Sequence, residues 1–113
     1  MSFDGKEILL TGGAGGLGGL ISRLITAEGG RVTVLDRTEP AGGLQFLRQD
    51  LSTPEGIEAA AEAVAARDWD IIVNLAGIQH FGPLELQSPG HLMASYLVNL
   101  VAPVRLTLSL IHI

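Results

Sequence analysis

Six of the fifteen glycines lie between Gly12 and Gly19, after a short apolar run and before apolar residues at helical spacing. Glycine allows a tight turn and a close approach of the backbone to a ligand, and a helix N-terminus offers free N–H groups to an anion. Asp36 ends the next apolar run, 18 residues after Gly18, close to the ~20 expected of a carboxylate that binds a ribose. The spacing predicts a dinucleotide site, with a glycine-rich turn and an unrelated surface Asp as the alternative.

Other kinds of site fit this pattern less well. A P-loop NTPase needs Gly-Lys-Ser/Thr after the glycines, and the chain has none there. A methyltransferase would also place an acidic residue after its second strand, but it would leave Thr11 and Asn74-Leu75-Ala76-Gly77 unexplained. No His and carboxylate residues have the spacing of metal ligands, so we expect no metal. His80 and His91 are interpreted as solvated residues rather than catalytic ones.

The elements that must position these residues follow from the apolar pattern. Short apolar runs bounded by turn residues indicate strands, and apolar residues three and four positions apart indicate helices. Ser52, Thr53 and Pro54 form a helix start, with Glu55 three residues after Ser52 as in a capping box. The sequence predicts strands at 8–10, 32–35, 44–47 and 69–73, and helices over 17–25, over 52–66 and from 88 onward. This alternation predicts one α/β domain with a parallel sheet and helices on both faces.

Composition limits the class of protein and its partners. The chain has 113 residues, with 7 Lys+Arg against 12 Asp+Glu and a formal net charge of −5. An acidic balance argues against a nucleic-acid partner, and the absence of Cys fits a reducing compartment. We expect neither a targeting segment nor a membrane span, because the apolar stretch 97–113 carries Asn99, Pro103, Arg105 and His112. The sequence therefore predicts a cytoplasmic protein.

Several short motifs occur in register with the predicted elements. They are Thr11-Gly12-x-x-x-Gly16-x-Gly18, Asp50-Leu51 after the third strand, Asn74-Leu75-Ala76-Gly77 after the fourth, and Asn99 in the last helix. With them, residues 5–107 resemble the short-chain dehydrogenases/reductases, although Leu75 replaces the second Asn of the family's NNAG. The loop also satisfies TGxxGxxG of the family's extended branch through Gly15. Ala76-Gly77, the loop 81–84 and Asn99 favour the compact single-domain branch.

The resemblance implies a Rossmann-type doubly wound parallel sheet, of which this chain supplies four of the usual seven strands in the order 3-2-1-4. It implies hydride transfer between a small alcohol or carbonyl substrate and a nicotinamide cofactor, in a parent protein that forms a homo-dimer or tetramer. Asn99 resembles the Asn that kinks the long helix and joins a catalytic tetrad through a bound water. The residues implied to contact the cofactor are Thr11, Gly12, Gly16, Leu17, Gly18, Asp36, Arg37, Asp50, Leu51, Asn74, Ala76 and Gly77.

Charge favours NAD over NADP as that cofactor. Asp36 can accept hydrogen bonds from both ribose hydroxyls, and its carboxylate would repel a 2′-phosphate. Arg37 could instead pair with such a phosphate, but Thr38 and Glu39 follow it and supply no second basic residue.

The remaining catalytic residues of the family have no counterpart in this chain. The only Tyr is Tyr96, interpreted as a packing residue, and the only Lys is Lys6, so Tyr-x-x-x-Lys and its partner Ser are missing. We expect residues 1–107 to be the cofactor-binding half of an NAD(P)-dependent oxidoreductase, with an exposed edge at the fourth strand and no activity of its own. The alternatives are a non-catalytic NAD-binding module and a functionless truncated product. Residues 108–113 are expected to be non-native, because DNA encoding them resembles a sequencing-library adapter.

Overall fold

The sheet of the computed structural model, which describes residues 2–78 and 82–111, has four parallel strands in the order β3-β2-β1-β4. The strands are β1 (Glu7–Thr11), β2 (Arg31–Asp36), β3 (Gln45–Arg48) and β4 (Ile71–Asn74). Thr11 pairs with Leu35 on one side and with Asn74 on the other, and Asp36 pairs with Arg48. The carboxyl ends of all four strands therefore meet at one edge of the sheet.

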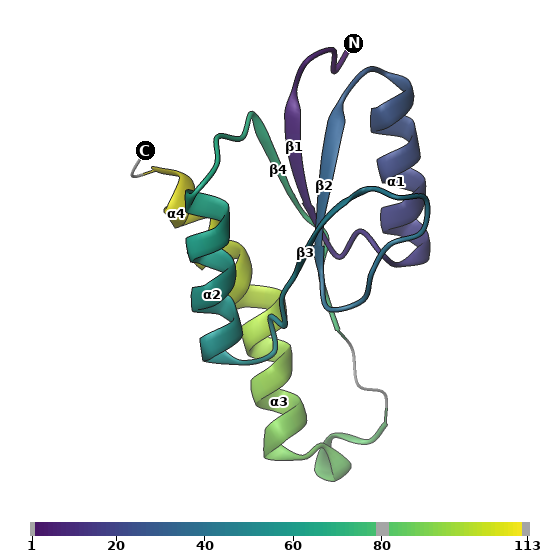
Figure 1. Ribbon diagram of the computed structural model, residues 1–113. Helices are drawn as coiled ribbons and strands as arrows, with labels where there is room; N and C mark the ends of the chain where they lie inside the picture. Colours follow the sequence, from purple (N-terminus) through teal and green to yellow (C-terminus); the bar gives the residue numbers. More distant parts are fainter. Residues whose placement is uncertain (1, 79–81, 112–113) are drawn as a thin grey trace.

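Helices cover both faces of the sheet (Figure 1). Helix α1 (Gly16–Ala27) lies on one face, and α2 (Pro54–Ala65) lies with α4 (Ala102–Ile111) on the other. The alternation of side chains along β1 decides which residue meets which helix. Ile8 and Leu10 pack in the cluster that includes Ile25 of α1, whereas Leu9 packs in the cluster that includes Ile57 and Leu106.

One long helix closes the described chain, after the short 3-10 helix η1 (Leu84–Leu86). It consists of α3 (Pro89–Tyr96), a π-helical segment η2 (Leu97–Val101) and α4. Its inner face packs on α2 and the sheet through Leu97, Val98, Ala102 and Leu106. The helix 89–111 is long and apolar enough to cross a membrane, with a mean hydropathy of 1.5 over an 18-residue stretch. Core helices of soluble proteins can be as long and as apolar.

The predicted fold class and strand order are confirmed, with local corrections. Trp69 and Asp70 precede β4 rather than belonging to it. The N-cap of α2 is Thr53, whose hydroxyl accepts from the Gly56 N–H at 3.0 Å, so the capping box expected from Ser52 is wrong. Tyr96 is 62% exposed and does not pack inside this chain. His80 lies outside the described residues.

The amino ends of the strands are closed by a cluster of polar and aromatic side chains around Arg67. Its guanidinium lies 4.5 Å from the centroid of the Trp69 ring and donates to Gln45 Oε1 at 3.1 Å. The Trp69 indole N–H donates to the Val64 carbonyl at 2.9 Å. Trp69 therefore covers this end of the sheet, and the opposite end is the open one.

Candidate functional site

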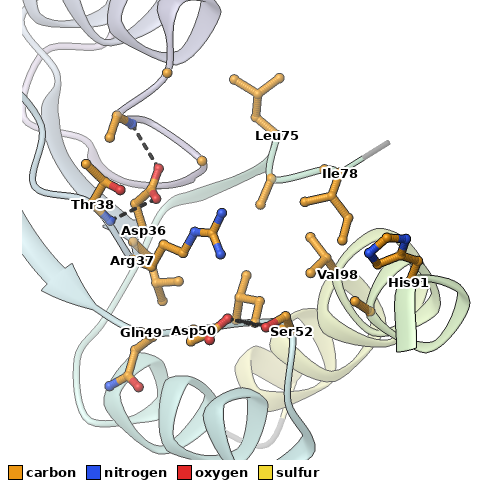
Figure 2. Close-up of a pocket in the computed structure, with 18 residues that line it drawn as sticks. Asp36, Arg37, Thr38, Gln49, Asp50, Ser52, Leu75, Ile78, His91 and Val98 are labelled. Carbon is orange, nitrogen blue, oxygen red and sulfur yellow. Dashed lines mark hydrogen bonds between the residues drawn. The ribbon is translucent and has the colours of Figure 1, made fainter. Parts of the chain in front are cut away.

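A cavity of about 550 Å³ lies at the carboxyl edge of the sheet (Figure 2). Three regions of the chain line it: the glycine loop before α1, the residues that follow β2 and β3, and the segment after β4 together with one face of the helix 89–111. Parallel strands place their carboxyl ends and the following loops together, and ligands bind in that crevice in open α/β sheets.

Packing alone requires at least three glycines of the loop, Gly12, Gly13 and Gly18; a Cβ on Gly13 would lie 2.7 Å from Val34 Cγ2. Gly12 has φ +74, and a Cβ built on it would lie 2.8 Å from both N and Cα of Ala76. A Cβ on Gly18 would overlap the carbonyl oxygen of Gly12 and lie 2.6 Å from Gly13 Cα. Gly16 is different, because a Cβ there meets no protein atom within 4 Å. The fold itself thus explains Gly12 and Gly18 but leaves open space beside Gly16.

The start of α1 opens toward this cavity without a side-chain cap. Its N-cap is Gly15, which lines the cavity, and its first turn holds no acidic residue. The loop is held instead by Asp36, whose Oδ2 accepts from the Ala14 N–H at 3.2 Å and whose Oδ1 accepts from the Thr38 N–H at 3.1 Å. Each oxygen of this carboxylate retains further acceptor capacity. The N-terminus of helix α1 and the carboxylate of Asp36 therefore face the same cavity.

Asp50 supplies a second carboxylate, after β3. Its Oδ1 accepts from the Ser52 hydroxyl at 2.6 Å and from the Ser52 N–H at 2.9 Å. These two hydrogen bonds, together with the positive charge of Arg37, lower the pKa of Asp50 below its usual value against an opposing effect of desolvation. Arg37 projects toward the middle of the cavity in Figure 2. The cavity therefore combines two carboxylates with one guanidinium.

Thr11 joins the glycine loop to the segment after β4 from a buried position. Its hydroxyl oxygen accepts from the N–H groups of Leu75 and Ala76, both at 3.1 Å, and its side chain is 1% exposed. Leu75, which departs from the family's second Asn, packs against the apolar cluster on the α1 face. A Leu fits this position because its side chain meets apolar atoms.

Asn99 fastens the same segment from the other side. Its Oδ1 accepts from the Ile78 N–H at 2.8 Å, and its Nδ2 donates to the Ile78 carbonyl at 2.9 Å. It lies in the π-helical segment, where the regular hydrogen-bond ladder of the helix is interrupted. Asn74 points elsewhere, toward Thr107, with Nδ2 at 3.4 Å from its hydroxyl oxygen.

The predicted cofactor residues fall into two groups. Those that line the cavity are Gly12, Asp36, Arg37, Asp50, Leu51, Ala76 and Gly77. Those that do not are Thr11, Gly16, Leu17, Gly18 and Asn74, and the predicted catalytic residue Asn99 also lies outside its lining. Thr11, Gly18 and Asn99 instead hold the backbone that forms the cavity, whereas Leu17 is 60% exposed on α1.

Sequence reasoning missed one wall of the cavity. His91, Ala94 and Val98 lie three and four residues apart on one face of the helix 89–111, and all three line it. Helical spacing could have grouped them, but apolar residues occur on every face of this helix. Ser52 and Thr38 were also missed as partners of the two carboxylates. Across residues 2–78 and 82–111, no group of three His, Cys, Asp or Glu residues could hold a metal ion.

The family follows from comparison with known proteins. The family model for short chain dehydrogenase matches residues 6–113. The chain belongs to the short-chain dehydrogenase family. D-threitol dehydrogenase of Mycolicibacterium smegmatis is 34% identical over 98 residues, which cover 73% of this chain and 37% of the relative. The first curated relatives are matched over only 31% to 37% of their own length.

Solved structures of the family share this fold. L-sorbose reductase from Gluconobacter frateurii, complexed with NADPH and L-sorbose, has a TM-score of 0.81 at 25% identity, covering 99% of this chain and 48% of that protein. 4-Hydroxyisoleucine dehydrogenase complexed with NADH has a TM-score of 0.83 at 26% identity, with 95% and 48% covered. The chain thus spans about half of these oxidoreductases, and members of the family bind either nicotinamide dinucleotide.

Proposed function

We propose that this chain binds the adenosine and pyrophosphate part of a nicotinamide dinucleotide, as the cofactor-binding part of a short-chain dehydrogenase. The observation that carries the proposal is the uncapped start of α1, which opens on the same cavity as the carboxylates of Asp36 and Asp50. A pyrophosphate supplies the anion that an uncapped helix N-terminus accommodates, and carboxylates accept from ribose hydroxyls and from an exocyclic amine.

The residues of the site fit such a cofactor. The open space beside Gly16 leaves room for a phosphate at the first turn of α1. Asp36 is held by two backbone N–H groups, so its carboxylate stays oriented toward a ribose. Asp50 and Leu51 would contact the base, while Ala76 and Gly77 line the part of the same cavity that follows β4. When bound, the nicotinamide ring supplies the hydride chemistry. Asn99 would support that end by holding the backbone of Ile78, whereas Asn74 is directed toward Thr107.

Charge supports NAD(H) over NADP(H). The fixed carboxylate of Asp36 would face a 2′-phosphate as a like charge, and Glu39 adds a second negative charge nearby in sequence. Arg37 is the one basic residue that lines the cavity among the described residues, and its charge already acts on Asp50. We therefore propose that Arg37 balances the two carboxylates rather than selecting a phosphate.

We propose that the parent protein interconverts an alcohol and a carbonyl, a type of reaction that the names D-threitol dehydrogenase and L-sorbose reductase indicate for those two relatives. We also propose that the parent protein is cytoplasmic. This chain alone would transfer no hydride, because its only Tyr lies on the exposed side of α3 and its only Lys precedes β1. Residues 108–111 continue helix α4. We still propose that 108–113 are adapter-encoded, which sequencing of the source DNA beyond codon 107 tests.

A second copy of the parent is the proposed protein partner. Large apolar side chains are exposed along the helix 89–111; they are Leu92, Met93, Tyr96, Leu100, Val101, Val104, Leu108 and Ile111. Arg105, the only Lys or Arg in this helix, pairs with Glu58 of α2 at 2.9 Å and leaves that face uncharged. Sedimentation equilibrium of the purified chain should report the mass of a dimer, and Leu100→Glu should reduce it to the mass of a monomer. The same mass for both proteins would contradict the assignment of this face.

Binding measurements test the proposed function directly. Isothermal titration of the purified chain should show NAD⁺ binding, weak because the nicotinamide end of the site lies in the part that this chain does not span. NADP⁺ should bind more weakly, and Asp36→Ala should reduce the difference between the two cofactors. Absence of NAD⁺ binding by folded protein would refute the proposal. Equal binding of both cofactors would refute only the preference.

A further inference from the structure

The wall of the cavity opposite Asp50 comes from one face of the helix 89–111. His91, Ala94 and Val98 lie on it at positions i, i+3 and i+7. Val98 is buried and belongs to the apolar core, so it lies at the bottom of the cavity on this side. The Ala94 side chain is a single methyl group and leaves space above Val98. His91 stands at the end of the row, beside Val98 and Ile78 in Figure 2.

The first turn of α3 fixes the position of the His91 backbone. Ser88 is the N-cap of this helix, and its hydroxyl oxygen accepts from the His91 N–H at 3.0 Å. Pro89 at the first helical position pre-sets the backbone of the same turn. Leu92 and Met93, the next residues, are exposed and do not line the cavity. The imidazole is therefore the side chain of the first turn that the fold presents to the cavity.

A flat base in this cavity has one aromatic side chain on which to stack. Among the described residues that line the cavity, His91 carries the only ring, and the other side chains there are aliphatic, polar or charged. An aromatic ring stacks on any base because every base has a π-face. The carboxylate of Asp50, whose lowered pKa keeps it a hydrogen-bond acceptor, lies on the strand side of the same cavity.

We infer that His91 is a further binding residue of this site, whose imidazole ring stacks on the purine base of the bound dinucleotide. The inference rests on the proposed function, since it requires a dinucleotide in this cavity. It adds the helix wall to a site that the sequence placed only on the glycine loop and the strand ends. The base would lie between the His91–Ala94–Val98 face and the strand side that bears Asp50 and Leu51.

Three substitutions at His91 separate stacking from hydrogen bonding. His91→Ala removes the ring, His91→Phe keeps a ring without N–H groups, and His91→Gln keeps a polar side chain without a ring. Isothermal titration with NAD⁺ should show affinity reduced about fivefold or more for His91→Ala and His91→Gln, and retained within about twofold for His91→Phe. Leu92→Ala, which changes the neighbouring exposed residue, should bind as the original chain does.

ADP-ribose, which keeps the purine and lacks the nicotinamide ring, is the second probe, and its affinity should change across these variants as that of NAD⁺ does. Unchanged NAD⁺ affinity of His91→Ala overturns the inference while the proposed function stands. Full affinity of His91→Gln with loss in His91→Phe also overturns it, because the imidazole would then act through hydrogen bonds. Failure of the unsubstituted, folded chain to bind NAD⁺ refutes the proposed function itself. Thermal unfolding of each variant, followed by Trp69 fluorescence, excludes loss of the fold as the cause.

Discussion

Helices α1 and α2 both begin shortly after a strand ends, at the same edge of the sheet, and their first turns are satisfied in different ways. In α2, the Thr53 hydroxyl caps the Gly56 N–H, Pro54 occupies the first helical position and Glu55 complements the dipole. In α1, Gly15 offers no side-chain cap and the first turn has no acidic residue. A Gly N-cap is less favourable than Ser, Thr, Asn or Asp by only a few tenths of a kcal/mol, so α1 can form without a side-chain cap. The difference indicates that residues at the start of α2 satisfy the N–H groups of its first turn, whereas the N–H groups of the first turn of α1 are left to bind an external anion.

Substitution of glycines within α1 gives the largest expected effect and sharpens this comparison. Gly18→Ala should lower the free energy of unfolding by about 3 kcal/mol, because its Cβ would overlap the carbonyl oxygen of Gly12. Gly16→Ala should leave stability unchanged or slightly higher and weaken NAD⁺ binding, since its Cβ would enter space that the protein leaves open. Urea unfolding followed by Trp69 fluorescence, together with titration calorimetry, measures both. Equal destabilisation by the two substitutions would show that packing governs Gly16 as well.

A buried hydroxyl at the end of β1 holds the segment that follows β4. Thr11→Val should lower the free energy of unfolding by about 2 kcal/mol, because the N–H groups of Leu75 and Ala76 lose their acceptor. Thr11→Ser retains the hydroxyl and should recover most of that loss. Urea unfolding of the two variants tests this. A Val variant as stable as the Ser variant would contradict the role assigned to the hydroxyl.

A cap introduced at α1 and a cap removed from α2 test the comparison in both directions. Gly15 has φ −77 and ψ 175, and its Cβ would lie 3.8 Å from the nearest protein atom, so Gly15→Asp is sterically permitted. It should raise the free energy of unfolding by up to about 1 kcal/mol and weaken NAD⁺ binding at least about tenfold, since a carboxylate would replace the phosphate. Thr53→Ala should cost about 1 kcal/mol and leave NAD⁺ affinity unchanged. Tight NAD⁺ binding by Gly15→Asp would place the pyrophosphate elsewhere.

The smallest expected effect concerns the pH dependence that Ser52 confers through Asp50. Hydrogen bonds from Ser52 lower the pKa of Asp50 in the folded state, so they stabilise the fold above the unfolded pKa of about 3.9. That contribution is lost as the pH falls through the lower folded pKa. In Ser52→Ala, the free energy of unfolding should fall less steeply below about pH 4. The difference from the original chain should be less than about 1 kcal/mol, because Asp50 is exposed to solvent. Urea unfolding between pH 2 and 7 measures the change; identical acid profiles would contradict it.

Much of the strand side of the site could be predicted from the sequence. The structure brings Gly12, Asp36 and Asp50, which were predicted to contact a cofactor, to one cavity, because each lies at or after the end of a strand of a parallel sheet. The helix wall could not be predicted in the same way. The helix 89–111 bears Leu, Met, Tyr or Val side chains on exposed and buried faces alike, so hydrophobicity did not indicate that the exposed His91 and the buried Val98 both line the cavity.

Thr11, Leu17 and Tyr96 show the same limit at single residues. The motif containing Thr11 was recognised, but its hydroxyl serves the backbone of residues 75 and 76, which are 64 and 65 positions away. Leu17 and Tyr96 have helical spacing typical of core residues, yet both are more than half exposed. Local pattern does not decide burial where a helix has more apolar residues than its neighbours can cover.

The sequence by itself determined the α/β class and the glycine-rich turn after the first strand, because these depend on local periodicity, glycine conformation and the rules of parallel sheets. The strand order came from the resemblance to the family. Only the tertiary structure decided which groups share the cavity and which hold it together. It separated the open space at Gly16 from the packed glycines 12 and 18, and it turned His91 toward the strand edge. These outcomes depend on contacts between residues distant in sequence, whose geometry exists only once both faces of the sheet are packed.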